Sequence, residues 1–217
     1  MQPIKNETSN LLIKKIENKG VPIKSIGKVN FGMQLRDRKV YIDDVIETKN
    51  KDILTKYHEP CYTGKNIKRY ELNYSNLYCF FNVEAKRGGC WDRETHSKKN
   101  KIIIRQIGAV PIATLDVNGY ALLNSAFMIT SEILDTKYIL ALINSKSIEF
   151  YWRNKFSDNR KTFPKIKGTY LEKIPIANTS DEVKIKIINL IDQILNNKDN
   201  NNPSSLDEDL PPAFISW

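Results

Sequence analysis

The 217-residue sequence has few of the side chains that hold metals or form cross-links. Its three cysteines, Cys61, Cys79 and Cys90, form no CxxC or CxxH spacing, so neither a zinc knuckle nor a disulfide framework is indicated. A reducing cytoplasm is the simplest location for such a chain. The only two histidines, His58 and His96, are far apart in the sequence, and we expect each in an ordinary loop. Neither histidine therefore anchors a catalytic triad.

Long apolar runs and nucleotide-binding motifs are also missing. No apolar stretch approaches the roughly 18 residues of a membrane span, and no signal peptide follows Met1, so we expect a soluble chain with no membrane partner. The segment GKNIK, which begins at Gly64, lacks the GxxxxGK(S/T) spacing of a phosphate loop. Gly88 and Gly89 form a basic turn without the GxGxxG series of a dinucleotide site. The Asn-Pro-Pro-aromatic loop of an adenine methyltransferase does not occur either.

Carboxylates that could hold metal ions for a nuclease do not cluster in the sequence. We considered Glu84, Asp92 and Asp116, but Glu84 has no acidic partner upstream and Asp116 adjoins an expected turn. Separated carboxylates in a basic domain usually form surface ion pairs. We therefore predict no catalytic residue, no metal site and no cofactor in this chain.

Positive charge is what the sequence has in excess. The formal net charge is +9 and the isoelectric point is about 9.3, which makes nucleic acid the first partner to test. Between residues 51 and 105, twelve basic side chains face six acidic ones, and between residues 151 and 173, seven face two. The second segment contains FSDNRKTFPKIKGTY (residues 156–170), in which four cations surround a rigid Phe163-Pro164 step.

Aromatic residues are interleaved with both basic segments. We expect Trp152 and Phe156 in a helix core. Trp91 lies in a glycine-rich basic loop between Arg87 and Arg93, where it either contacts bases or sugar or folds back onto the core. The sequence leaves both interpretations of Trp91 open.

Short β-type runs fill the middle of the sequence. After a predicted helix at residues 8–20, residues 21–46 have the composition of strands broken by tight turns, and residues 77–83 are a candidate for a buried strand. Residues 101–130 contain three further runs rich in Ile, Val and Thr, and the Asn118-Gly119 pair among them predicts a two-residue hairpin turn.

Helices dominate the last third of the sequence. Two consecutive helices are predicted at residues 134–156, the first capped by Asp135 or Thr136 and the second restarting at Ser145. A last helix begins at Ser180, and its apolar stripe must be buried against something. Strands followed by helices favour an α+β fold with a mixed or antiparallel sheet and flanking helices. We expect a domain at residues 1–178, a spacer-like helix at 179–198 and an acidic linker or tail at 199–217.

Six segments stand in a familiar order: VNFGMQLRD (29–37), TGKNIKRY (63–70), KIIIRQIG (101–108), LLNSAFMI (122–129), YILALINSKSIEFYW (138–152) and KTFPKIKGTYLEKIPI (161–176). Together they resemble the TaqI-like C-terminal specificity domain, the target-recognition module of bacterial restriction-modification enzymes. The resemblance spans about Val21 to Ile176.

The resemblance implies recognition of duplex DNA without catalysis. An adenine-N6 methyltransferase or nuclease domain or subunit would act beside this module, and S-adenosylmethionine and magnesium would belong to those parts. Related modules in type I specificity subunits are followed by a long spacer helix, which the helix from Ser180 resembles. An exposed apolar stripe on that helix would dock a catalytic subunit or a second helix.

The basic residues divide into two expected roles. We predict base-edge or groove contacts from Arg36, Arg38, Arg87 and Trp91, since arginine can bond guanine O6 and N7 together. We predict phosphate contacts from Lys65, Lys68, Arg69, Arg160, Lys161, Lys165 and Lys167. The alternatives are an RNA-binding module, a small metal-dependent nuclease and a protein-interaction scaffold that uses the final helix.

Overall fold

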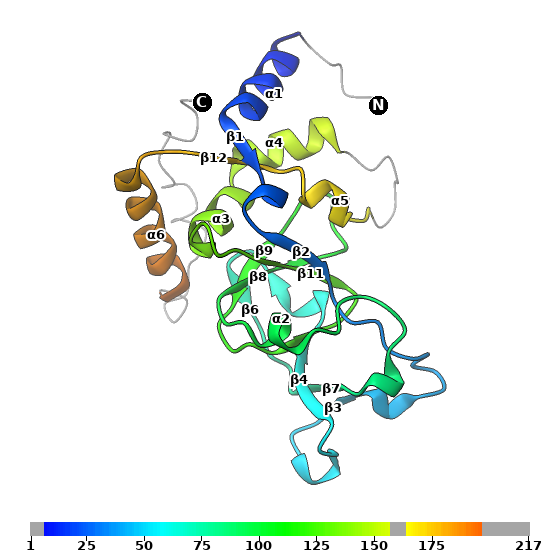
Figure 1. The fold of residues 1–217 in the computed structure, drawn as a ribbon. Coiled ribbons are helices and arrows are strands. Elements are labelled where there is room, and N and C mark those ends of the chain that lie inside the picture. The colour runs from blue at the N-terminus through cyan, green and yellow to red at the C-terminus, as the bar shows by residue number, and fades with distance from the viewer. Residues whose placement is uncertain (1–6, 157–163, 197–217) are drawn as a thin grey trace.

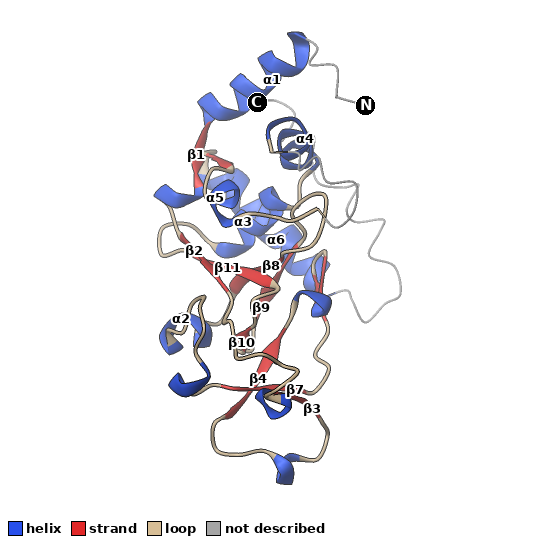
Figure 2. Cartoon of the chain, turned by 90° about the vertical axis from the view of Figure 1, so that its right-hand side faces the viewer, coloured by secondary structure: helices blue, strands red, loops and turns tan. Residues whose placement is uncertain are grey.

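A computed structural model describes residues 7–156 and 164–196 of the chain. Most helices gather at one end, a four-stranded sheet crosses the middle and a second four-stranded sheet forms the other end (Figure 1). The view turned by 90° shows the same succession of layers (Figure 2). The fold is therefore α+β, as the sequence predicts. Over the described ranges, no helix combines the length and the apolar character that crossing a membrane requires.

The central sheet has the strand order β2-β11-β8-β9 and is antiparallel throughout. Ile102 and Ile104 of β8 pack in one apolar cluster with the residues of α3, whereas Ile103 packs in another with Tyr62. A strand that is covered on both faces needs no polar alternation, which explains the unbroken apolar run in its sequence. The strands are β2 (Lys28–Phe31), β8 (Lys101–Arg105), β9 (Ala113–Asp116) and β11 (Ala126–Thr130).

The second sheet has the strand order β10-β4-β7-β3, and its β10-β4 pair is parallel whereas the others are antiparallel. This sheet is therefore mixed. Strand β7 ends at Phe80 rather than Val83, because the Asn82 side chain accepts a hydrogen bond from the backbone of Glu84 and caps a 3-10 helix there. The strands are β3 (Val45–Glu47), β4 (His58–Tyr62), β7 (Leu77–Phe80) and β10 (Ala121–Leu122).

The hairpin predicted at Asn118-Gly119 is wrong. Gly119 does adopt a left-handed φ of 74°, but β9 pairs only with β8 and the chain continues into β10 of the other sheet. The Asp116 carboxylate organises this turn by accepting hydrogen bonds from the backbone nitrogens of Asn118 (2.9 Å), Gly119 (3.0 Å) and Tyr120 (3.0 Å). A side-chain cap, rather than a strand pair, closes the turn.

Two helices, at residues 136–143 and 146–155, begin at predicted capping residues. The Asp135 carboxylate accepts a hydrogen bond from the backbone of Lys137 (2.7 Å), and the Ser145 hydroxyl accepts one from Ile148 (3.2 Å). Both caps and the N-terminal helix are confirmed. The helices are α1 (Glu7–Lys19), α2 (Arg93–Ser97), α3 (Thr136–Ile143), α4 (Lys146–Lys155), α5 (Gly168–Leu171) and α6 (Asp181–Asn196). Two further antiparallel pairs join β1 (Gly20–Pro22) to β12 (Pro175–Ala177) and β5 (Ile67–Lys68) to β6 (Glu71–Leu72).

Helix α6 packs against α3 of the same chain (Figure 1). Its apolar stripe, Ile187, Ile191 and Ile194, is buried in the same cluster as the central sheet. Burial of each such side chain contributes about 1.5–3 kcal/mol. The stripe is therefore covered by α3 of the same chain. It is not exposed for a catalytic subunit to dock on.

A buried ion pair joins β8 and β9 of the central sheet. The Lys101 ammonium binds the Asp116 carboxylate, both side chains are fully inaccessible, and the ammonium also donates to the carbonyl of Tyr120 (3.1 Å). Burial lowers the pKa of Lys101, and the attraction of Asp116 opposes this shift. Asp116 is thus committed to the fold on both its carboxylate oxygens.

The two histidines are not in loops, contrary to the prediction. His96 is buried in α2, where its Nδ1 accepts a hydrogen bond from the backbone of Leu122 (3.1 Å). Burial lowers the pKa of His96, which favours the neutral ring that this bond requires. His58 begins β4, and its ring bonds the Asp43 carbonyl (2.8 Å). Both side chains hold neighbouring segments together.

Candidate nucleic-acid interface

Three backbone segments meet where the chain leaves β2. The nitrogen of Met33 donates to the carbonyl of Leu122 (2.7 Å), and the nitrogen of Asn124 donates to the carbonyl of Met33 (2.8 Å). On the other side, Gln34 exchanges backbone hydrogen bonds with Gly88 and Arg87, each 2.9 Å long. Residues 33–34 are therefore held between two loops that are distant in sequence.

Glycines permit this close approach. A Cβ atom on Gly32 would lie 2.2 Å from the carbonyl oxygen of Leu123, and one on Gly89 would lie 2.1 Å from the carbonyl oxygen of Gly32. Gly89 also has a left-handed φ of 72°. The glycine pair at 88–89, which the sequence presents as a flexible turn, is thus a fixed packing element.

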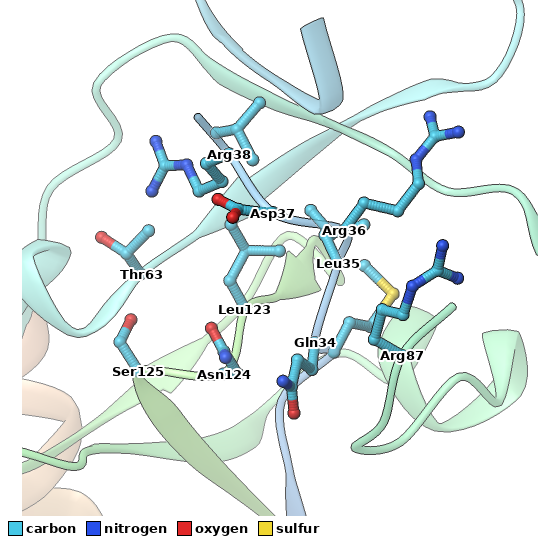
Figure 3. A pocket seen from close by; sticks show the side chains of 12 residues that line it. Gln34, Leu35, Arg36, Asp37, Arg38, Thr63, Arg87, Leu123, Asn124 and Ser125 are labelled. Carbon is cyan, nitrogen blue, oxygen red and sulfur yellow. The ribbon is translucent and has the colours of Figure 1, made fainter. Parts of the chain in front are cut away.

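A pocket of about 680 Å³ opens over this junction. Three of the four side chains predicted to contact bases, Arg36, Arg38 and Arg87, border it (Figure 3). The structure therefore brings together arginines separated by about fifty residues of sequence. The lining consists of Met33, Gln34, Leu35, Arg36, Asp37, Arg38, Val45, Thr63, Arg87, Leu123, Asn124 and Ser125.

Arg36 already has a partner in the protein. Its Nε donates to Oδ2 of Asp44 (3.0 Å) and its Nη2 to Oδ1 (2.6 Å), while the guanidinium lies 4.0 Å from the ring centroid of Tyr41. The hydrogen bonds with Asp44 raise the pKa of Arg36. Because Asp44 is only 2% exposed, the pair fixes the loop that separates the two residues. Two of the five donors of Arg36 are thus committed to the fold.

Arg38 and Arg87 are more available. The side chain of Arg38 is exposed and makes no hydrogen bond or ion pair with any residue of the described ranges. Arg87 is also exposed, and its Nη1 donates to the carbonyl of Lys86 (2.8 Å). Figure 3 shows Arg38 directed to one side of the pocket and Arg87 to the other. These two guanidiniums can still offer paired donors to a ligand.

Trp91, the fourth side chain predicted to contact bases, is not part of the pocket lining. Its ring meets Phe81 edge to face, with 5.5 Å between centroids, and its Nε1 donates to the carbonyl of Gly88 (2.8 Å). The side chain is half-buried, so the structure places it on the core and under the glycine loop. Contact between Trp91 and a base stays a prediction.

The cations predicted to contact phosphates have different surroundings. Lys65 is exposed and lies next to the pocket, since the nitrogen of Gly64 donates to the Ser125 hydroxyl (2.8 Å). Lys68 pairs with Glu71 (3.0 Å). Arg69 is half-buried, and its Nη2 donates to the carbonyl of Asn144 at the end of α3. Of these three cations, Lys65 is the one whose sequence neighbour, Gly64, contacts a residue of the pocket lining.

Lys165 and Lys167 border a second depression. This groove of about 490 Å³ has an apolar floor that includes Val29, Phe31 and Phe127. Backbone bonds connect it to the pocket, because Ile166 donates to the carbonyl of Gln106 (2.8 Å) and Gln106 to that of Ser125 (2.8 Å). The segments that line the pocket and the groove are therefore neighbours, and the two hollows together are called the pocket edge. Arg160 and Lys161 lie outside the described residues.

Across residues 7–156 and 164–196, no three side chains of the His, Cys, Asp or Glu types come together in a way that could hold a metal ion. Cys61, Cys79 and Cys90 are free thiols in this structure.

Solved restriction-modification proteins share this fold. The HsdS subunit from Thermoanaerobacter tengcongensis gives a TM-score of 0.51 at 11% identity, over 97% of this chain and 50% of that one. The type IIG restriction endonuclease BpuSI gives 0.59 at 10%, over 93% and 31%. The type IIL restriction-modification enzyme MmeI, in complex with DNA, gives 0.58 at 10%, over 90% and 31%. The chain thus spans about half of the HsdS subunit and about a third of the other two, and the likeness concerns the fold.

The sequence comparison identifies the family. The TaqI-like C-terminal specificity domain matches residues 59–176, which is more than half of the chain, although the match begins later than the expected Val21. No curated protein sequence matches the chain. The matched region contains Lys65, Arg87 and Lys165, whereas Arg36 and Arg38 precede it. By this match, the chain belongs to the family of TaqI-like C-terminal specificity domains.

Proposed function

We propose that this chain is the target-recognition module of a bacterial restriction-modification system and that it binds duplex DNA along the pocket edge. The observation that carries the proposal is the pair of available guanidiniums, Arg38 and Arg87, at a concave pocket in a member of a specificity-domain family. Arginine can bond O6 and N7 of guanine at once in the major groove. Such contacts distinguish one base pair from another.

Positive charge along the same edge supports a phosphate grip. Lys65 adjoins the pocket, and Lys165 and Lys167 border the groove beyond it. Contacts of lysine with phosphate position a protein on the duplex without reading its sequence. Lys68 is paired with Glu71 and the Arg69 guanidinium is bound to the carbonyl of Asn144, so we expect a smaller contribution from these two cations.

The proposal gives the chain no catalytic role. Methylation of adenine N6 and cleavage of DNA belong to a partner domain or subunit, which also holds S-adenosylmethionine and magnesium. The chain covers 50% of the HsdS subunit and 31% of BpuSI and of MmeI, so those proteins contain much that has no counterpart here. Bacterial DNA as the ligand makes the cytoplasm the proposed location.

Competition binding with the purified chain tests the proposal. A labelled random-sequence duplex is bound, and unlabelled duplex DNA or single-stranded RNA of equal length is added at physiological ionic strength. We expect duplex DNA to compete better, and repeated selection from the duplex pool to enrich one short sequence. Stronger competition by RNA would instead indicate an RNA-binding module.

Two further outcomes would overturn the proposal. Phosphate contacts are strongest at low salt concentration. Failure to bind duplex DNA even under that condition would favour a protein-interaction scaffold. Cleavage of a plasmid in the presence of magnesium, abolished by Glu84→Ala, would favour a nuclease.

A further inference from the structure

Two uncharged side chains at the pocket occupy matched positions on neighbouring backbones. Met33 and Leu123 form a parallel bridge, so the residues that follow them, Gln34 and Asn124, stand at equivalent points of the register. Gln34 also bridges Gly88 in the antiparallel sense. Bridged backbones lie about 4.8 Å apart, which places Asn124, Gln34 and Gly88 in one short row.

Neither carboxamide is used by the fold. Gln34 and Asn124 are both exposed and line the pocket, and neither side chain forms a hydrogen bond or ion pair with another residue of the described part of the chain (Figure 3). Their backbones, by contrast, are fixed by the hydrogen bonds to Gly88 and Met33. The protein therefore presents two amide groups from rigid supports, with all their donors and acceptors available.

The third member of the row has no side chain, and this leaves space for Gln34. A Cβ atom on Gly88 would lie 3.1 Å from Oε1 and 3.9 Å from Cδ of Gln34. The carboxamide of Gln34 thus lies directly against Gly88. A Cβ atom at position 88 would require this carboxamide to shift by a few tenths of an ångström.

We propose that Gln34 and Asn124 recognise adenine bases of the DNA target. This inference rests on the proposed function. A carboxamide matches the major-groove edge of adenine, because its oxygen accepts from N6 and its nitrogen donates to N7. Neither group carries charge, so these two side chains add base discrimination without adding to the phosphate attraction that Lys65 supplies.

The spacing of the two side chains also predicts how their targets are arranged. Successive bases on a strand rise by about 3.4 Å, and the backbones of Gln34 and Asn124 lie about 4.8 Å apart. Two flexible amides at that separation reach neighbouring base pairs but not distant ones. The two recognised adenines therefore belong to consecutive base pairs.

Parallel selections from one random-sequence duplex pool test the inference. The unaltered chain is compared with Gln34→Ala and Asn124→Ala, and Asn178→Ala serves as the matched control because Asn178 is exposed and follows β12 at the helical end. Each pocket variant should lose its preference for adenine at one base pair by about 5- to 150-fold, and the two affected base pairs should be adjacent. The control should select the same sequence as the unaltered chain.

Gly88→Ala provides an independent test that leaves both carboxamides in place. It should weaken the preference at the base pair that Gln34→Ala affects and leave the other one unchanged. If the unaltered chain selects no sequence, the proposed function itself fails. If it selects a sequence in which both pocket variants keep every adenine preference, the inference is overturned and the proposed function stands.

Discussion

The helical end and the pocket edge use their polar side chains in opposite ways. At the helical end, the Asn144 side chain ties the end of α3 to the central sheet, accepting from the nitrogen of Ala113 (3.1 Å) and donating to its carbonyl (3.0 Å). At the pocket edge, Gln34, Arg38 and Asn124 make no side-chain hydrogen bond with any residue of the described ranges. A scaffold satisfies its own polar groups, whereas a recognition surface leaves them for a ligand.

The largest effect on stability should come from the buried ion pair of the central sheet. Lys101→Met removes the partner of a fully buried carboxylate, so we expect a loss of about 3–5 kcal/mol in the free energy of unfolding, measured by urea denaturation. Lys99→Met, at an exposed neighbouring position, should change it by less than about 0.5 kcal/mol. Equal effects of the two substitutions would contradict the structural role of the pair.

A second substitution tests whether α6 is part of the scaffold. Ile191 is fully buried, and Ile191→Ala should cost about 2–5 kcal/mol while the chain still unfolds in one transition. The control, Ile185→Ala on the same helix, replaces a side chain that is 57% exposed and should be nearly neutral. A separate early transition for α6 would show instead that this helix is an independent spacer.

The contrast is sharpest between two nearby arginines. Arg36→Ala leaves the buried Asp44 carboxylate without its cation and should destabilise the fold by about 1–3 kcal/mol. Arg38→Ala should leave stability within about 0.5 kcal/mol and reduce discrimination at one base pair by about 1–3 kcal/mol. Thermal unfolding and binding to the selected duplex measure the two quantities. Loss of stability in Arg38→Ala, with none in Arg36→Ala, would contradict the roles assigned to the two arginines.

The smallest effect, a general weakening of DNA binding, is expected from the loss of a single phosphate contact. Lys65→Ala should weaken binding to all duplexes alike and reduce the slope of log K against log salt concentration by about one unit. The control, Lys186→Ala, removes another exposed lysine, which lies on α6, and should leave the slope unchanged. A change of base preference in Lys65→Ala would contradict its assignment as a phosphate contact.

Local features of the fold could be predicted from the sequence because they depend on nearby residues. Asp135 and Ser145 cap their helices through bonds two and three residues away, and the apolar run in β8 marks a buried strand. The turn at Asn118-Gly119 was predicted, but the strand that follows it pairs with β4 instead of β9. That choice depends on residues about sixty positions upstream, which a local pattern does not contain.

The candidate site was predictable only where charge marked it. Arg38 and Arg87 can be predicted because arginine is the side chain that bonds O6 and N7 of guanine together, but the ion pair that holds Arg36 depends on the tertiary position of Asp44. Gln34 and Asn124 were missed because an isolated carboxamide resembles any other surface residue. Only the bridge between Met33 and Leu123 shows that they stand side by side.

Hydrogen–deuterium exchange with and without the selected duplex tests the central claim most directly. If the pocket edge binds DNA, the duplex should slow amide exchange in residues 33–38, 63–66 and 122–125, and exchange in α6 should remain unchanged. Protection confined to α3 and α6, with none at the pocket, would contradict the claim that the pocket edge is the recognition surface.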